Sequence, residues 1–132
     1  MKIPKAIYRI IIGFFLFLFG KSELSAQQVS VQELHELINT DSALVLIDVR
    51  TPAEFEGEME MLESAFNIEL SVIEDSIGYL SQHKDKDIYL ICRSGNRSGR
   101  AAEKLKAKGF NAINVTGGML AYRKEYPWGG KK

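Results

Sequence analysis

The chain has few of the residues on which disulfides and thiol–imidazole dyads depend, with one cysteine and two histidines among 132 residues. One cysteine cannot form an intrachain disulfide, so Cys92 is a free thiol. His35 falls in an expected surface helix and His83 in the polar turn Gln82-His83-Lys84. We expect both imidazoles to be solvated, which disfavours a Cys-His protease. The sequence also has no internal repeat and no low-complexity linker.

Long apolar runs are scarce as well. The N-terminal run from Ile10 to Gly20 has eleven residues, against about twenty for a membrane-spanning helix. Three basic residues precede it, and Leu24-Ser25-Ala26 follows with a small final residue, which is the order of a secretory signal peptide. We therefore expect a signal peptide over residues 1–26 and an exported, periplasmic protein. The alternative is an uncleaved signal anchor that tethers the protein to the membrane. A lipidated cysteine is disfavoured because none lies near the cleavage region.

The remaining 106 residues, 27–132, have the size of one domain and a net charge of −3. A net negative domain is a poor nucleic-acid binder, and its basic residues are not interleaved with aromatics. The charges are uneven: residues 27–92 hold three basic and fourteen acidic groups, and residues 93–132 hold ten basic and two acidic groups. A local anion site therefore fits better than a nucleic-acid surface. We expect a monomer without stable membrane insertion once the signal is cleaved.

Hydrophobic periodicity predicts helices that alternate with strands along this domain. Continuous apolar runs of strand length, such as Ala43 to Ile47, are typical of parallel strands that are covered on both faces. Strands alternating with helices in a small domain predict an α/β fold with a mostly parallel central sheet flanked by helices. The predicted strands are 43–47, 65–68, 87–91 and 112–115, and the predicted helices are 31–39, 52–56, 70–82, a helix after Ser98 that Gly109 closes, and 118–126.

The loop after the strand 87–91 carries the chemistry. Cys92 ends that strand, at the sheet edge where ligands gather in open α/β folds. The residues Arg93 to Ser98 then lead into a helix, so backbone N–H groups and the positive helix end can surround one anion. The same surroundings lower a thiol pKa from about 8.5 toward neutrality. The alternative is that Cys92 is a small buried hydrophobe, with the loop arginines serving solubility and Ser98 capping the helix.

Cysteine phosphatases are an enzyme class that uses a similar cradle, in which an arginine stands six residues after the cysteine. Here that position is Ser98, and Arg97 comes one residue early. A shorter loop fits a sulfur atom better than a tetrahedral phosphate. Phosphatase and arsenate reductase activity are therefore disfavoured.

Three motifs in this order resemble those of single-domain rhodaneses, which are sulfurtransferases. They are the loop 92–98, the stretch Asp48 to Phe55, and the stretch Asn114 to Tyr122, where the family usually ends in tryptophan. The resemblance covers essentially the whole domain and implies a three-layer rhodanese-like fold. One departure is the acidic segment Glu58 to Ser64, which has seven residues where the family usually has four. This departure leaves substrate and partner choice open.

The resemblance implies sulfane-sulfur transfer from a small anionic donor such as thiosulfate to cyanide or a thiol through a persulfide on the catalytic cysteine. A protein sulfur acceptor or reductant is the further expected partner, and no metal or other cofactor is expected. A non-enzymatic sulfur-carrier or protein-binding module is the alternative. In these roles we expect Cys92 to be catalytic, Arg93, Ser94, Gly95, Asn96, Arg97 and Ser98 to bind substrate, and Asp48, Arg50 and Glu54 to support the site through ion pairs.

Overall fold

A five-stranded sheet forms the centre of the molecule in the computed structural model, which describes residues 27–57 and 59–128. The strand order is β1-β5-β4-β2-β3, and every pair of neighbours is parallel. This arrangement confirms the predicted α/β class with a parallel sheet. The strands are β1 (Gln27–Val29), β2 (Val45–Asp48), β3 (Ala65–Asn67), β4 (Asp87–Ile91) and β5 (Asn111–Val115).

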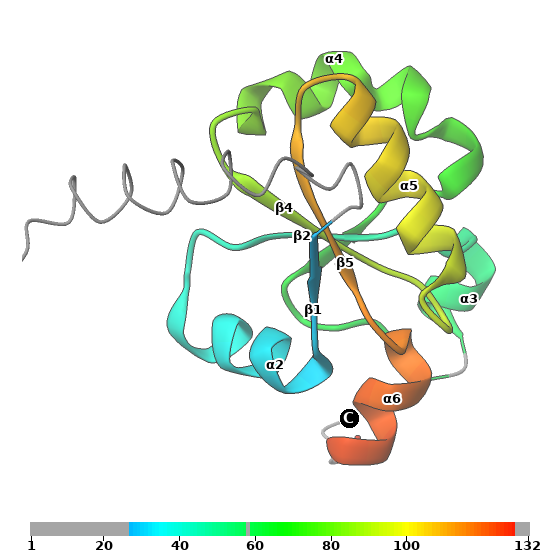
Figure 1. Ribbon diagram of the computed structural model, residues 1–132. Coiled ribbons are helices and arrows are strands. Elements are labelled where there is room, and N and C mark those ends of the chain that lie inside the picture. Colours follow the sequence, from blue (N-terminus) through cyan, green and yellow to red (C-terminus); the bar gives the residue numbers. More distant parts are fainter. Residues whose placement is uncertain (1–26, 58, 129–132) are drawn as a thin grey trace, which may run out of the picture.

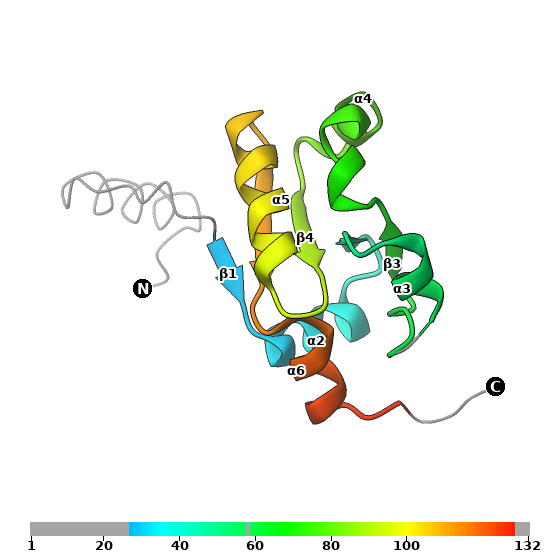
Figure 2. The ribbon, with the colours of Figure 1, turned by 90° about the vertical axis from the view of Figure 1, so that its right-hand side faces the viewer.

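Helices cover both faces of the sheet and complete three layers (Figures 1 and 2). On one face lie α5 (Asn96–Ala107) and the stretch around α4 (Ile77–Leu80), and on the other face α2 (Val31–Thr40) contacts α6 (Gly118–Glu125). The short α3 (Pro52–Glu56) follows β2. Three 3-10 turns complete the described chain: η1 (Leu70–Val72), η2 (Glu74–Ser76) and η3 (Ser81–His83).

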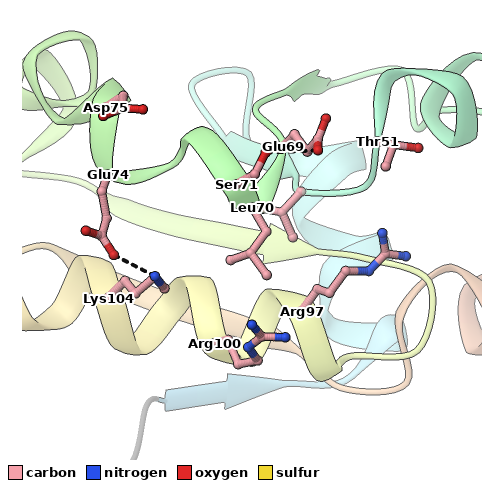
Figure 3. A pocket seen from close by; sticks show the side chains of 10 residues that line it. Thr51, Glu69, Leu70, Ser71, Glu74, Asp75, Arg97, Arg100 and Lys104 are labelled. Carbon is pink, nitrogen blue, oxygen red and sulfur yellow. Dashed lines mark hydrogen bonds and ion pairs between the residues drawn. The ribbon is translucent and has the colours of Figure 1, made fainter.

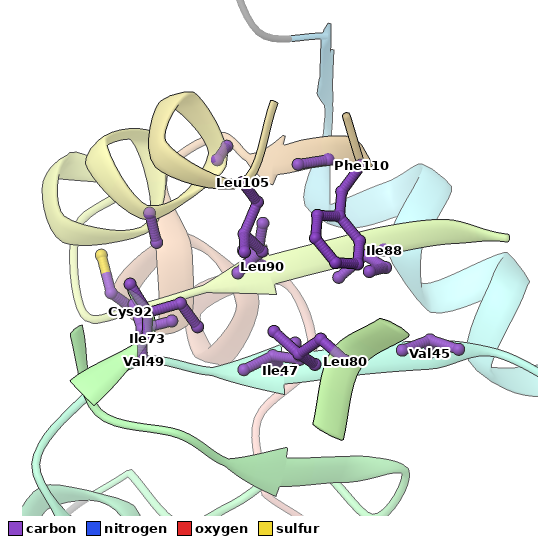
Figure 4. Packing of buried hydrophobic residues seen from close by; sticks show 13 residues of the cluster. Val45, Ile47, Val49, Ile73, Leu80, Ile88, Leu90, Cys92, Leu105 and Phe110 are labelled. Atoms are coloured by element: carbon purple, nitrogen blue, oxygen red, sulfur yellow. The ribbon is translucent and has the colours of Figure 1, made fainter. Parts of the chain in front are cut away.

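The apolar runs form two hydrophobic layers because alternate residues of each strand point to opposite faces. Ile47 and Leu90 pack on the α5 side, and Leu46 and Ile91 pack on the α2 side. All four side chains are fully buried, as expected for central parallel strands that are covered twice. Figure 4 shows the layer on the α5 side.

The structure differs from the expected elements in two places. The predicted helix over 70–82 is a series of 3-10 turns with four α-helical residues, α4. Within it the hydroxyls of Ser76 and Ser81 donate to carbonyls four residues earlier, a local alternative to a regular helix. Strand β1 was not predicted, because three residues carry no periodicity and its partner, β5, lies far along the chain.

The expected signal peptide, residues 1–26, lies outside the described residues. Among the helices that are described, none is both long and apolar enough to cross a membrane.

Candidate active site

Cys92 follows β4 directly, at the carboxyl edge of the sheet. Its side chain is fully buried and points toward the α5 side of the sheet (Figure 4). The neighbouring strand β2 ends at the same edge, where the Val49 N–H donates to the Ile91 carbonyl over 2.9 Å. The structure therefore places the thiol where an α/β sheet gathers its ligands.

Hydrogen-bond donors converge on the Cys92 sulfur. The Gly95 N–H lies 3.1 Å from Sγ, and the Ser98 hydroxyl oxygen lies 3.3 Å from it. Burial by itself raises the pKa of the Cys92 thiol. Hydrogen bonds from the Ser98 side chain and from the backbone N–H groups of Ser98, Gly95 and Ser94 outweigh it, so that the pKa lies below its ordinary value. The donor set stabilises an anion at this sulfur, as the loop sequence predicted.

Two glycines allow the loop to take this shape. Gly95 precedes α5 with φ of 103°, a left-handed conformation that side chains rarely adopt. At Gly118 a Cβ atom would lie 2.5 Å from the Cys92 carbonyl oxygen. That close approach lets the first turn of α6 satisfy the loop, because the Met119 N–H donates to the Cys92 carbonyl over 2.8 Å. The loop therefore presents N–H groups to the sulfur and carbonyls to α6.

The first supporting ion pair is local and buried. The Arg50 guanidinium donates through Nε to both carboxylate oxygens of Asp48 at 3.0 Å and through Nη2 to Oδ2 at 2.8 Å. The Arg50 backbone N–H also donates to Asp48 Oδ1. Both side chains have no exposed surface, so the pair is part of the core at the end of β2.

The second ion pair joins α3 to α5. Glu54 accepts from Arg97 through two parallel bonds, Nη1 to Oε1 at 2.6 Å and Nη2 to Oε2 at 2.8 Å. The Arg97 hydrogen bonds hold the pKa of Glu54 at about 2, against a smaller opposing effect of burial and with help from the Thr51 N–H. Thr51 also forms a capping box with Glu54 at the start of α3.

Asp48, Arg50 and Glu54 all form ion pairs: Asp48 and Arg50 pair with each other, and Glu54 pairs with Arg97. The contacts correct the alternative interpretation of Ser98 as a helix cap. Ser98 does not cap α5: the helix begins at Asn96 with Gly95 as its cap, so the Ser98 hydroxyl lies one turn inside and is available to the sulfur.

The remaining loop residues lie on the surface. Arg93, Ser94 and Asn96 are exposed, and the Arg93 side chain makes no ion pair within residues 27–57 and 59–128. Beside the loop a groove of about 530 Å³ runs between α5 and the η1–η2 stretch (Figure 3). Arg97 and Arg100 line one wall and Glu69 the other. Of the two loop arginines, Arg97 pairs with Glu54, whereas no carboxylate in the described structure neutralises the charge of Arg93.

Two asparagines of the site were not singled out from the sequence. Asn67, at the end of β3, donates through Nδ2 to the carbonyls of Asp48 and Arg50 at 2.9 and 2.8 Å. Asn114, near the end of β5, accepts from the Ser98 hydroxyl at 2.6 Å. A polar residue inside an apolar strand is the signal that could have identified Asn114.

The histidines are less solvated than predicted. His35 Nδ1 lies 2.8 Å from the Tyr122 hydroxyl oxygen. The His35 ring stacks on the Tyr126 ring, with 3.7 Å between the ring centroids. The Nδ1 atom of His83 is buried and has no hydrogen-bond partner among the described residues. Both imidazoles are half-buried by aromatic packing. In the described structure, neither imidazole is hydrogen-bonded to the Cys92 sulfur.

Comparison with known proteins finds similarity to one domain family. The sequence model of the rhodanese-like domain family matches residues 30–125. The Bacillus subtilis protein YtwF, whose name carries the word sulfurtransferase, is 38% identical over 103 residues, which is 77% of this chain and 95% of YtwF. YrkF of the same organism, whose name carries the words sulfur carrier protein, is 32% identical over 96 residues, which is 72% of this chain and 50% of YrkF.

A solved structure shows the same fold. The crystal structure of a rhodanese-like domain protein from Staphylococcus aureus superimposes with a TM-score of 0.66 at 30% identity and covers 73% of this chain and 90% of that protein.

Proposed function

The chain belongs to the rhodanese-like domain family, and on that premise we propose that it transfers sulfane sulfur through a persulfide on Cys92. The observation that carries the proposal is the convergence of the Gly95 N–H and the Ser98 hydroxyl on one buried sulfur. Such a donor set stabilises a thiolate before sulfur arrives, and the backbone N–H groups of the loop can stabilise the anionic persulfide afterwards. Relatives named for sulfurtransferase and sulfur-carrier activity support sulfur chemistry in general.

The reaction consists of two displacements. In the first, the Cys92 thiolate attacks the sulfane sulfur of a donor such as thiosulfate, a new S–S bond forms, and the donor's S–S bond breaks with its electron pair leaving on sulfite. In the second, cyanide or a thiolate attacks the terminal sulfur, and the electron pair of the broken bond returns to Cys92. Because Cys92 is buried, a narrow donor with a terminal sulfur fits better than a bulky one.

The two loop arginines contribute differently. Arg93 is exposed and free of ion pairs in the described chain, so it is the first candidate to attract the donor's anionic end. Arg97 is held by Glu54 and supports the loop in this state. The engaged Arg97 also argues against phosphate chemistry, which needs an arginine free to bind phosphate oxygens.

The test measures thiocyanate formation from thiosulfate and cyanide by the purified protein. We expect steady turnover that falls by at least roughly 1,000-fold in Cys92→Ser, because the nucleophile is lost. Lys108→Ala, an exposed basic residue at the far end of α5, is the matched control and should retain turnover. Intact mass after thiosulfate treatment should show a gain of about 32 Da, one sulfur atom, on wild type alone.

The same measurements separate a second candidate function. A carrier that hands sulfur only to a dedicated partner would gain the sulfur without turnover. The segment after α3 favours this alternative. Two arginines anchor it, because Arg50 donates to the Glu60 carbonyl and Arg123 donates to the Met59 carbonyl. In this anchored segment the apolar Met61 is 44% exposed. If the wild-type protein shows no turnover and no mass gain, both functions are rejected.

A further inference from the structure

Asn114 is a polar residue at a core position. It lies on β5, two residues after Ala112, which packs in the hydrophobic layer under α5. Because alternate strand residues share a face, Asn114 also faces α5, and only 7% of it is exposed. A buried amide needs hydrogen-bond partners for its oxygen and nitrogen, whereas an apolar side chain at this position would need none.

The contacts of Asn114 set the orientation of its amide. Nδ2 lies 3.3 Å from the Gly95 carbonyl oxygen, and Oδ1 lies 2.6 Å from the Ser98 hydroxyl oxygen. Turning the amide over would place Oδ1 against the Gly95 carbonyl, and two acceptors repel each other. Asn114 therefore presents an acceptor to Ser98.

The Ser98 hydroxyl has one proton and two acceptors within reach. Asn114 Oδ1 lies at 2.6 Å and Cys92 Sγ at 3.3 Å. When Cys92 is a thiol, its S–H donates to Ser98 and Ser98 donates to Asn114, so every group is satisfied. When Cys92 is a thiolate, the hydroxyl proton has to turn toward sulfur, and the buried Oδ1 loses its donor.

We propose that Asn114 is a positioning residue that competes with the Cys92 thiolate for the Ser98 proton and thereby favours the thiol and the sulfur-loaded form over the empty thiolate. The inference deepens and rests on the proposed function. In the persulfide the negative charge resides on the terminal sulfur, so Sγ needs the Ser98 proton less and Asn114 keeps it. When an acceptor removes the terminal sulfur, charge returns to Sγ, and the competition resumes.

The effect of Asn114 on the Cys92 sulfur can be separated from the effects of the charged groups around it. Arg97 on α5 interacts with Cys92 through its charge, and Glu54 on α3 pairs with Arg97. At the end of β2, Asp48 and Arg50 pair with each other, and Arg93 follows Cys92 in the loop. Substituting the uncharged Asn114 changes none of these charges.

The test titrates the Cys92 thiolate of the purified protein by its absorbance and by its rate of alkylation with iodoacetamide across pH. In Asn114→Leu, which removes the acceptor and keeps the branched shape, we expect the pKa to fall by roughly half a unit to one unit, the size of one hydrogen bond. Asn114→Ala should shift it in the same direction. Ser98→Ala should raise the pKa instead, because a donor to the thiolate is lost.

The decisive variant is Ser98→Ala combined with Asn114→Leu. Since Asn114 acts through the Ser98 proton, its substitution should have no effect on the pKa in the Ser98→Ala background. An equal shift in both backgrounds, or no fall in either Asn114 variant, overturns the inference. Asn111→Ala, on the same strand but exposed, is the matched control and should leave the pKa unchanged.

The persulfide supplies a second readout. After loading with thiosulfate, Asn114→Leu should lose its terminal sulfur to dithiothreitol at least roughly threefold faster than wild type. The reason is that the Ser98 hydroxyl is then free to donate a hydrogen bond to Sγ as negative charge returns to it. An unchanged rate overturns the inference. If wild type forms no persulfide, the proposed function fails, while the thiolate titration still decides the role of Asn114.

Discussion

The two ion pairs that support the loop use the same chemistry in opposite environments. Asp48 and Arg50 are two residues apart and have no exposed surface. Glu54 and Arg97 are 43 residues apart, and their side chains are 33% and 30% exposed. Both arginines engage both oxygens of their carboxylates. Arg50 does so through Nε and Nη2, and Arg97 through Nη1 and Nη2, so the difference that bears on stability lies in water access and in chain separation.

That difference assigns the pairs separate tasks. A buried charge that loses its partner has no water to replace it, so neither Asp48 nor Arg50 can be removed alone without a large penalty. Water can solvate Glu54 or Arg97 when their pair opens, so it contributes less to stability. The buried pair belongs to the framework of the site, and the half-exposed pair connects α3 to the loop helix α5 and can open.

The largest expected effect breaks the buried pair. Arg50→Ala should lower the free energy of unfolding by roughly 3–5 kcal/mol, because it leaves the Asp48 carboxylate buried and unpaired. Urea unfolding monitored by circular dichroism measures this loss. Arg100→Ala, an exposed arginine, should change stability by less than about 0.5 kcal/mol. A similar loss in both variants would contradict the distinction between framework and surface charges.

A smaller effect is expected for the half-exposed pair. In a double-mutant cycle with Glu54→Ala and Arg97→Ala, the coupling free energy should be about 1 kcal/mol or less, because water competes for both groups. The same cycle on Glu74 and Lys104, whose ion pair is more exposed, is the control and should show weaker coupling. A coupling as large as the Arg50 loss would show that exposure does not separate the two pairs.

The smallest effect concerns acid stability. The pKa of Glu54 is about 2 in the folded chain, below its ordinary value of 4.5. Its contribution to folding is therefore complete above about pH 4.5 and is lost as the pH falls through about 2. The stability advantage of wild type over Glu54→Gln should shrink as urea titrations move from about pH 5 toward about pH 3. With Arg97→Ala in both chains, most of this pH dependence should disappear.

Local patterns predicted much of the fold and the centre of the site. The apolar runs ending at Asp48 and at Cys92 identified two central strands, and the predicted helix 52–56 is α3. The loop after Cys92 indicated an anion cradle, and the structure supplies its donors. These features depend on residues that are close in sequence, which is why pattern and spacing were sufficient.

Only the tertiary structure decided which distant groups meet. The partner of Arg97 is Glu54 and not a free anion, Ser98 meets Asn114 across α5 and β5, and β1 pairs with a strand more than eighty residues away. The sequence by itself determined that Cys92 ends a buried strand and precedes a loop of small and basic residues that leads into a helix. Which neighbours hold that loop and compete for its protons depends on packing between segments, because burial and long-range contact leave no periodic signal in the chain.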